Sequence, residues 1–153
     1  MNLFENLVRA LIVSVALWAS TTTSAHANDL KGEAVEEIIH EVFIDQPLVA
    51  EAVIVISNCE STGLVHRRSD GSYLPNTTGS GAAGALQLTV STHQQESDRL
   101  GLELNLSTDA GYFSYVRYLV EKRGFRDWRW SEHCWGDEVD HIMRGNDPRR
   151  LLS

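Results

Sequence analysis

The sequence predicts a single, mostly α-helical domain that is closed by one disulfide bond. Hydrophobic residues recur at spacings of three and four on both sides of a glycine-rich middle segment, which is the pattern of amphipathic helices. No pair of alternating segments indicates a sheet. The chain has 153 residues, and removal of a predicted leader over 1–27 leaves 126 (153 − 27), enough for one compact domain. Its two cysteines, Cys59 and Cys134, both follow that leader.

Residues 1–27 have the features of a signal peptide. Arg9 supplies the positive charge, the apolar run LIVSVALWA follows, and Ala25 and Ala27 are the small residues that signal peptidase requires before its cut. The apolar run has about half of the ~20 residues that a membrane-spanning helix needs. We therefore expect export to the periplasm or beyond the cell, with no stable membrane span after cleavage; the alternative is an uncleaved anchor.

The charge of the chain argues against nucleic acid as a partner. Its formal net charge is −8, and cleavage removes one basic and one acidic residue, Arg9 and Glu5, which leaves that value unchanged. An acidic surface without a basic stripe repels phosphate backbones.

Cys59 and Cys134 are predicted to pair, because an even number of cysteines in an oxidising compartment favours a bridge. The alternative is two buried free thiols. A thiol enzyme is disfavoured, because neither cysteine has a positively charged neighbourhood or CxxC spacing.

Residues 28–46 predict an N-terminal helical extension, in which four hydrophobic residues share one helical face, namely Val35, Ile38, Ile39 and Val42. The main domain is predicted over 47–136. Asp45 is expected to cap its first helix, with Pro47 in the first turn. The β-branched run AVIVI in this segment also suits a strand, but more than ten residues without a turn signal favour a helix.

On that helix Glu60 lies on the same apolar stripe as Val53 and Ile56. A carboxyl group in apolar surroundings tends to keep its proton, and a protonated carboxyl is what a general acid requires. The alternative is a solvent-exposed glutamate, or one that pairs with Arg67 or Arg68.

The glycine-rich segment TGSGAAGALQ ends at Gln87 and lies in a predicted loop over 63–85 and just beyond. Its glycines permit close approach of the backbone to a ligand, and the amide of Gln87 offers both a donor and an acceptor. A flexible connector is the alternative.

Two further helices and a short tail complete the predicted domain. Ser91 with Gln94 forms a capping box for a helix that stops at Gly101. The next helix carries four residues on one face and stops at Gly124, the four being Tyr112, Tyr115, Val116 and Leu119. Three tryptophans, Trp128, Trp130 and Trp135, are expected to pack around Cys134; the alternative is that they line a groove and stack on sugar rings. Residues 137–153 form a short tail that includes a last short helix.

Glu60 and Ser61, followed by TGSGAAGALQ, resemble the soluble lytic transglycosylases. The lysozyme-like domain of that family carries a Glu-Ser pair and then Ser-x-x-Gly-Ala-x-Gly-Leu-Met-Gln, whose last residue corresponds to Gln87. The CES triplet and the tryptophans near Cys134 are also similar to the lysozyme-like domains of resuscitation-promoting factors, in which the cysteines pair. The resemblance covers about residues 48–135.

The resemblance implies a lysozyme-like fold and cleavage of the β-1,4 bond between N-acetylmuramic acid and N-acetylglucosamine in peptidoglycan, with a 1,6-anhydro product. Glu60 is then the single acid and base, Thr78 stands where the family has a helper serine, and Gln87 holds an N-acetyl group or orients Glu60. The family's Ala-Tyr-Asn motif is absent. Tyr112 and Tyr115 are candidates for its phenol, and core packing is the alternative for each.

Two other functions fit the same residues. One is a hydrolytic lysozyme, in which Asp70 or Asp109 assists a water molecule, although Asp70 also fits a turn-forming role. The other is a non-catalytic glycan-binding module. No cofactor is expected, and no metal, because His93 and His133 do not have metal-binding spacing.

Overall fold

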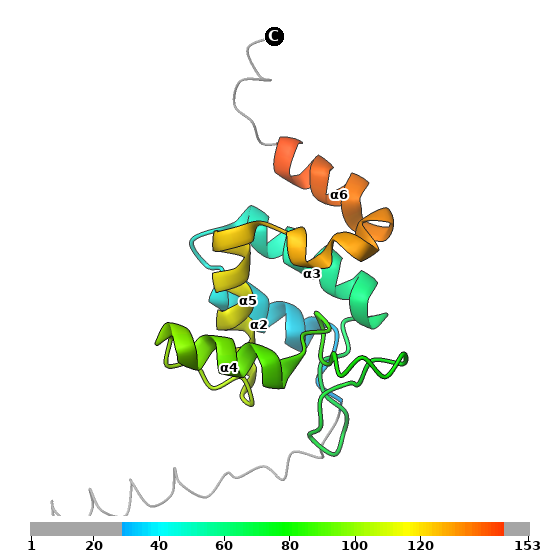
Figure 1. Cartoon of the computed structure of the whole chain (residues 1–153). Coiled ribbons are helices and arrows are strands. Elements are labelled where there is room, and N and C mark those ends of the chain that lie inside the picture. The colour runs from blue at the N-terminus through cyan, green and yellow to red at the C-terminus, as the bar shows by residue number, and fades with distance from the viewer. Residues whose placement is uncertain (1–28, 146–153) are drawn as a thin grey trace, which may run out of the picture.

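The computed structural model describes residues 29–145, so the leader predicted over 1–27 and the end of the tail lie outside the described residues. The described chain is mostly helical, which confirms the predicted class, and its β structure is limited to isolated bridges (Figure 1). In chain order the elements are α2 (Glu33–Val42), α3 (Pro47–Ser61), α4 (Val90–Leu100), α5 (Asp109–Arg123), the 3-10 helix η1 (Arg126–Ser131) and α6 (Glu132–Gly145).

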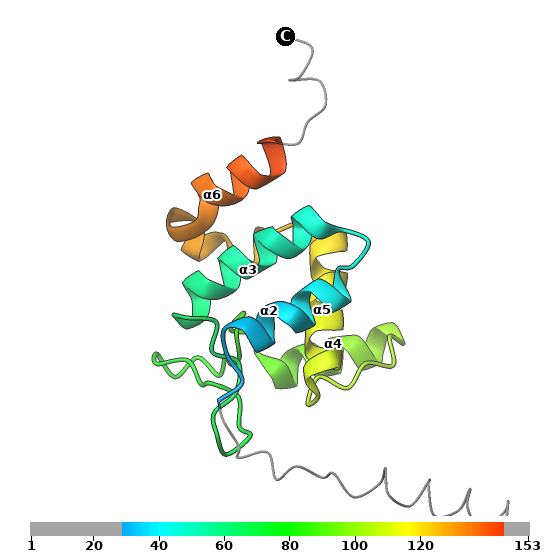
Figure 2. The ribbon, with the colours of Figure 1, turned by 180° about the vertical axis from the view of Figure 1, so that it is seen from behind.

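Helix α2 buries Val35 and Ile39, and Phe43 follows at its end, all with no exposed surface. This apolar face packs against α3 and α5 (Figure 2). The segment predicted as an N-terminal extension over 28–46 therefore contributes to the same core as the rest of the described chain.

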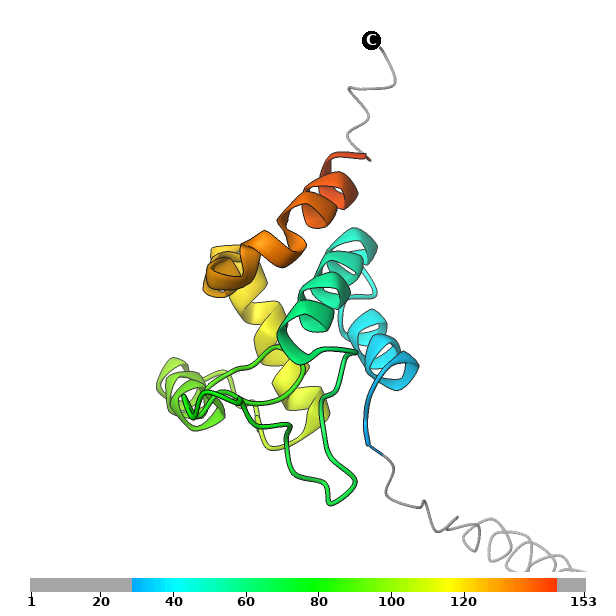
Figure 3. The same ribbon diagram turned by 90° about the vertical axis from the view of Figure 1, so that its right-hand side faces the viewer.

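The AVIVI run is helical, as predicted, and it lies in the middle of α3. Val53 and Ile56 are buried, and α3 lies between α2 on one side and α6 with η1 on the other (Figure 3). Because both sides of α3 are covered, Val53 and Ile56 are buried and Ile54 and Val55 partly buried, and this packing overrides their weaker helix propensity.

The predicted cap at the start of α3 is wrong. The N-cap residue is Gln46, Pro47 takes the first helical position, and no side chain caps the helix. Asp45 instead accepts two hydrogen bonds from Arg117 of α5, at 2.7 and 2.9 Å. These hydrogen bonds lower the pKa of Asp45. The aspartate joins two helices rather than capping one.

Helix α5 has the predicted inner face, because Tyr112, Tyr115, Val116 and Leu119 are all fully buried. Helix α4 stops at Gly101 as predicted, but it begins at Val90 and has no side-chain cap. The amide of Gln94 bonds the backbone of Leu104 and Leu106, at 2.8 Å each, instead of completing a capping box.

The three tryptophans near the C-terminus differ in solvent exposure. Trp128 and Trp135 are 4% and 6% exposed, but Trp130 is 92% exposed, so the prediction that all three pack around Cys134 is wrong for Trp130. Helix η1 is kinked at Trp128, whose φ of −103° is not helical. Trp128 and Ser131 turn inward and bond Leu86 and Glu60, whereas Trp130 turns outward. Helix α6 continues without a break past residue 136, where the tail was predicted to begin.

Cys59 near the end of α3 is bonded to Cys134 near the start of α6, which confirms the predicted disulfide; their Cα atoms are 6.1 Å apart. Helices α3 and α6 pack against each other along this junction. None of the helices in residues 29–145 is both long and apolar enough to cross a bilayer.

We predict that Cys134→Ser lowers the free energy of unfolding by about 4 kcal/mol in oxidising buffer, because a bridge across 75 positions restricts the unfolded chain. Chemical denaturation of both proteins measures this difference. Under reducing conditions the variant and the wild type should unfold alike. Titration of two free thiols in the native, oxidised wild type would contradict the prediction.

Candidate functional site

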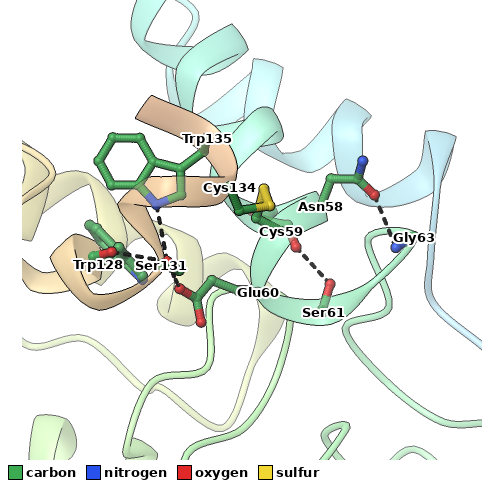
Figure 4. Close-up of a disulfide and its surroundings, with 10 residues drawn as sticks. Asn58, Cys59, Glu60, Ser61, Gly63, Trp128, Ser131, Cys134 and Trp135 are labelled. Atoms are coloured by element: carbon green, nitrogen blue, oxygen red, sulfur yellow. Dashed lines mark hydrogen bonds between the residues drawn. A yellow bond between two sulfur atoms is a disulfide. The ribbon is translucent and has the colours of Figure 1, made fainter. Parts of the chain in front are cut away.

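Glu60 lies in the last turn of α3 and is partly buried. Its carboxylate points toward η1, where the hydroxyl of Ser131 donates a hydrogen bond to Oε1 (Figure 4). Thr62, in a left-handed conformation, ends the helix two residues later. The side chain is therefore neither in the core nor free in bulk water, and neither Arg67 nor Arg68 is its partner.

Ser131 is itself held by two tryptophans. The indole Nε1 of Trp135 donates to Ser131 Oγ over 3.0 Å, and the carbonyl oxygen of Trp128 lies 2.9 Å from the same atom. Both indoles are buried. The disulfide adds a covalent constraint, because Cys59 precedes Glu60 and Cys134 follows Ser131 by one helical turn.

The glycine-rich segment ends in a tight loop over residues 83–88. Ala83 and Leu88 close it with two backbone hydrogen bonds of 2.9 and 3.0 Å. The hydroxyl of Tyr112 reaches into the loop, where it donates to the carbonyl of Ala83 at 3.0 Å and accepts from the amide of Leu86 at 3.2 Å. Burial raises the pKa of Tyr112, which keeps the phenol protonated and able to donate.

His66 holds the loop from the other side. Its Nδ1 accepts a hydrogen bond from the amide of Ala85 at 3.1 Å. Burial lowers the pKa of His66 to about 4, although the nearby Asp109 carboxylate opposes that shift. The ring is therefore neutral near pH 7, which leaves Nδ1 free to accept. Gly84 has a φ of 79° and sits where a Cβ would be 2.9 Å from His66 Nδ1 and 3.0 Å from Tyr112 Oη.

Gln87 adopts a left-handed backbone conformation with φ of 51°, which is uncommon for a residue with a side chain. Its Nε2 donates to the carbonyl of Gly84 at 2.8 Å. Its Oε1 is buried and has no hydrogen-bond partner within the described chain. A buried acceptor without a partner is costly, and the described chain supplies no donor for this oxygen.

Helix η1 connects this loop to Glu60. The indole Nε1 of Trp128 donates to the carbonyl of Leu86 at 2.9 Å, and Ser131, three residues later, binds Glu60. The negative charge of Glu60 also adds to the rise in the pKa of Tyr112, whose first cause is burial. The predicted acid and the loop that carries Gln87 are thus anchored to the same short helix.

The other predicted binding residues lie elsewhere. Thr78 is exposed, and its backbone N–H and its hydroxyl both bond the side chain of Asn76 within a turn. Tyr115 is fully buried on α5 and donates to Glu96 Oε2 of α4 at 2.8 Å. Tyr112 is also fully buried, so both tyrosines occupy the core positions that were the alternative for them.

The two candidate second carboxylates are both bound to other groups. Asp70 accepts hydrogen bonds from the amide and hydroxyl of Ser72, as its turn-forming alternative predicts. Asp109 accepts from Arg67 Nε, and it lies 3.3 Å from His66 Nε2 in a geometry that does not make a hydrogen bond. Over residues 29–145 no cluster of three or more acidic, histidine or cysteine side chains could hold a metal ion.

Two hollows, with volumes of about 490 and 380 Å³, lie along η1 and α6. They share Arg129, Glu132 and Asp140 in their walls, and neither is lined by Glu60 or Gln87.

Sequence reasoning missed Ser131 and His66, and it named Trp128 without its partner, the carbonyl of Leu86. For Ser131 a signal was available, because a bridge from Cys59 to Cys134 brings the residue after Cys59 close to the turn that precedes Cys134. For His66 and Trp128 no local pattern indicated which loop amide or carbonyl each would bind.

Comparison of the chain with protein-family models, curated proteins and solved structures finds no match.

We predict that Gly84→Ala destabilises the protein more than Gly81→Ala. Both glycines have a φ of 79°, so an added Cβ carries a similar backbone cost of about 1 kcal/mol at each. At Gly81 that Cβ meets nothing within 4 Å, whereas at Gly84 it crowds His66 and Tyr112, which adds about 1–3 kcal/mol. Urea denaturation measures both variants, and equal losses would contradict the loop geometry.

Proposed function

We propose that the protein is an exported peptidoglycan lytic transglycosylase with a lysozyme-like fold. The bond cleaved is the β-1,4 link between N-acetylmuramic acid and N-acetylglucosamine. The observation that carries the proposal is the position of Glu60. It lies partly buried in the last turn of α3 and is bonded to Ser131, while Trp128 of the same short helix as Ser131 binds the loop just before Gln87. A partly buried carboxyl that is anchored to the same short helix as a glycine-rich loop suits acid catalysis on an N-acetylated sugar.

One carboxyl group can complete this reaction. Protonated Glu60 donates its proton to the glycosidic oxygen as the bond from that oxygen to C1 of the muramoyl residue breaks, with the bonding electrons leaving on oxygen. The resulting carboxylate then takes the proton of the C6 hydroxyl as that oxygen attacks C1. The 1,6-anhydro ring closes without water, and Glu60 regains its proton.

Gln87 is the residue best suited to orient the substrate. Its Oε1 is buried and lacks a partner in the described chain, so a local shift that exposes it would let it accept a hydrogen bond from the N–H of an N-acetyl group. The hydrogen bond from Nε2 to Gly84 fixes the amide plane within the loop.

A hydrolytic lysozyme is less well supported. Inverting hydrolysis uses two carboxyl groups about 6.5–9.5 Å apart, with the second activating water. Asp70 accepts hydrogen bonds within its own turn, and Asp109 accepts one from Arg67, so neither is free to activate water. The products distinguish the two reactions, because the anhydro sugar is lighter than the hydrolysed one by one water.

We predict that Glu60→Gln reduces the release of soluble fragments from purified peptidoglycan by about 10²–10⁴-fold, because the amide cannot transfer a proton. Its melting temperature should be unchanged or higher, since an amide avoids the cost of partly burying a charge and can still bond Ser131. Turbidity loss and thermal melting provide the two measurements.

Glu51→Gln is the matched control, because Glu51 lies on the same helix with its side chain about half exposed, and it should cleave at the wild-type rate. Equal cleavage by the wild type and Glu60→Gln would contradict the catalytic role. If neither cleaves but both sediment with sacculi, the protein is a glycan-binding module.

A further inference from the structure

Ser131 is the contact of Glu60 that the resemblance does not assign. Its Oγ meets three groups: Oε1 of Glu60, the carbonyl oxygen of Trp128 at 2.9 Å, and Nε1 of Trp135 at 3.0 Å (Figure 4). Glu60 comes from α3 and the serine from the end of η1, so the contact joins elements that are distant in sequence.

The bonding capacity of this hydroxyl is limited. A serine has one hydrogen to donate and two lone pairs that accept. The indole N–H of Trp135 can only donate, so it occupies one lone pair permanently. One hydrogen and one lone pair remain, and the hydrogen has two acceptors within reach, Glu60 and the carbonyl of Trp128.

We infer that Ser131 is a positioning residue that supports both protonation states of Glu60 during one catalytic cycle; this rests on the proposed function. When Glu60 is ionised, the serine donates its hydrogen to the carboxylate. When Glu60 carries the transferable proton on Oε2, Oε1 is a carbonyl oxygen that still accepts from Ser131, so the proton is not held by the serine. One contact therefore serves both states, and no heavy atom needs to move.

The surroundings hold Ser131 in place for this role. Trp128 and Trp135 are buried, and the indole of Trp128 is tied to the carbonyl of Leu86. The disulfide closes the same junction one turn further along the chain. A single geometry can therefore serve for proton donation and for proton removal, which a mechanism with one carboxyl requires.

The other ionisable groups around Glu60 and Ser131 are either bonded to other residues or exposed to solvent. Tyr112 of α5 responds to the charge of Glu60, but burial raises its pKa and its hydroxyl is committed to the loop. Asp127 of η1 accepts from Arg123 of α5. The remaining ionisable residues of η1 and of the first turn of α6 are exposed, where solvent screens them: Arg126, Arg129, Glu132 and His133.

The experiment measures peptidoglycan cleavage as a function of pH for the wild type, Ser131→Ala and the nearly isosteric pair Ser131→Thr and Ser131→Val. We expect Ser131→Ala to lower kcat by about 10–100-fold with KM changed less than about twofold, because the carboxyl loses its orientation. The alkaline limb of the pH profile should move up by about one pH unit, because the ionised carboxylate loses a charge-assisted donor.

Ser131→Thr keeps the hydroxyl and should restore the wild-type kcat and pH profile, whereas Ser131→Val should behave like Ser131→Ala. Thermal melting follows all four proteins, and the Thr and Val pair decides the outcome if Ser131→Ala does not fold. The inference is overturned if Ser131→Val and Ser131→Thr have the same pH profile while Glu60→Gln is inactive. That result would leave the proposed function intact. Absence of cleavage by the wild type overturns both.

Discussion

The covalent junction between α3 and α6 is the constraint on which the candidate site depends. The bridge from Cys59 to Cys134 holds the end of one helix against the start of another. Glu60 directly follows Cys59, and Ser131 lies one turn before Cys134. Without such a junction the last turn of α3 would tend to fray, because a helix end lacks half of its backbone partners. With it, a carboxylate in that terminal turn has a fixed neighbour. The position of Glu60 is therefore a property of two helices and a disulfide rather than of α3 alone.

Helix η1 links Glu60 to the glycine-rich loop through the hydrogen bonds of Ser131 and Trp128. Trp128 binds the carbonyl of Leu86, while Tyr112 and His66 bind backbone atoms inside the same loop. Neutral side chains make these contacts, since burial holds the pKa of the phenol high and that of the imidazole low. Loop and carboxylate are consequently pre-organised without any charge opposing the negative charge of Glu60, which suits a group that must both give and take a proton.

The helices were largely predictable because they depend on local pattern. Apolar spacing placed the inner faces of α2 and α5, run length decided for a helix in the AVIVI segment, and glycines marked the ends of α4 and α5. The capping predictions were wrong because the side chains found distant partners, as Asp45 did with Arg117. Thr78 bonds Asn76 within its own turn, and Trp130 lies in a kinked 3-10 segment, and neither feature was indicated by the motif or the apolar spacing. Ser131 depends on how α3 meets η1 beside the disulfide, which periodicity does not contain.

The most direct test of the central claim is a crystal structure of Glu60→Gln with a bound peptidoglycan tetrasaccharide. We expect the amide at position 60 to lie about 3 Å from the oxygen of the scissile glycosidic bond, with an N-acetyl group at the Oε1 of Gln87. A saccharide bound at another surface, with residue 60 turned to bulk water, would contradict it.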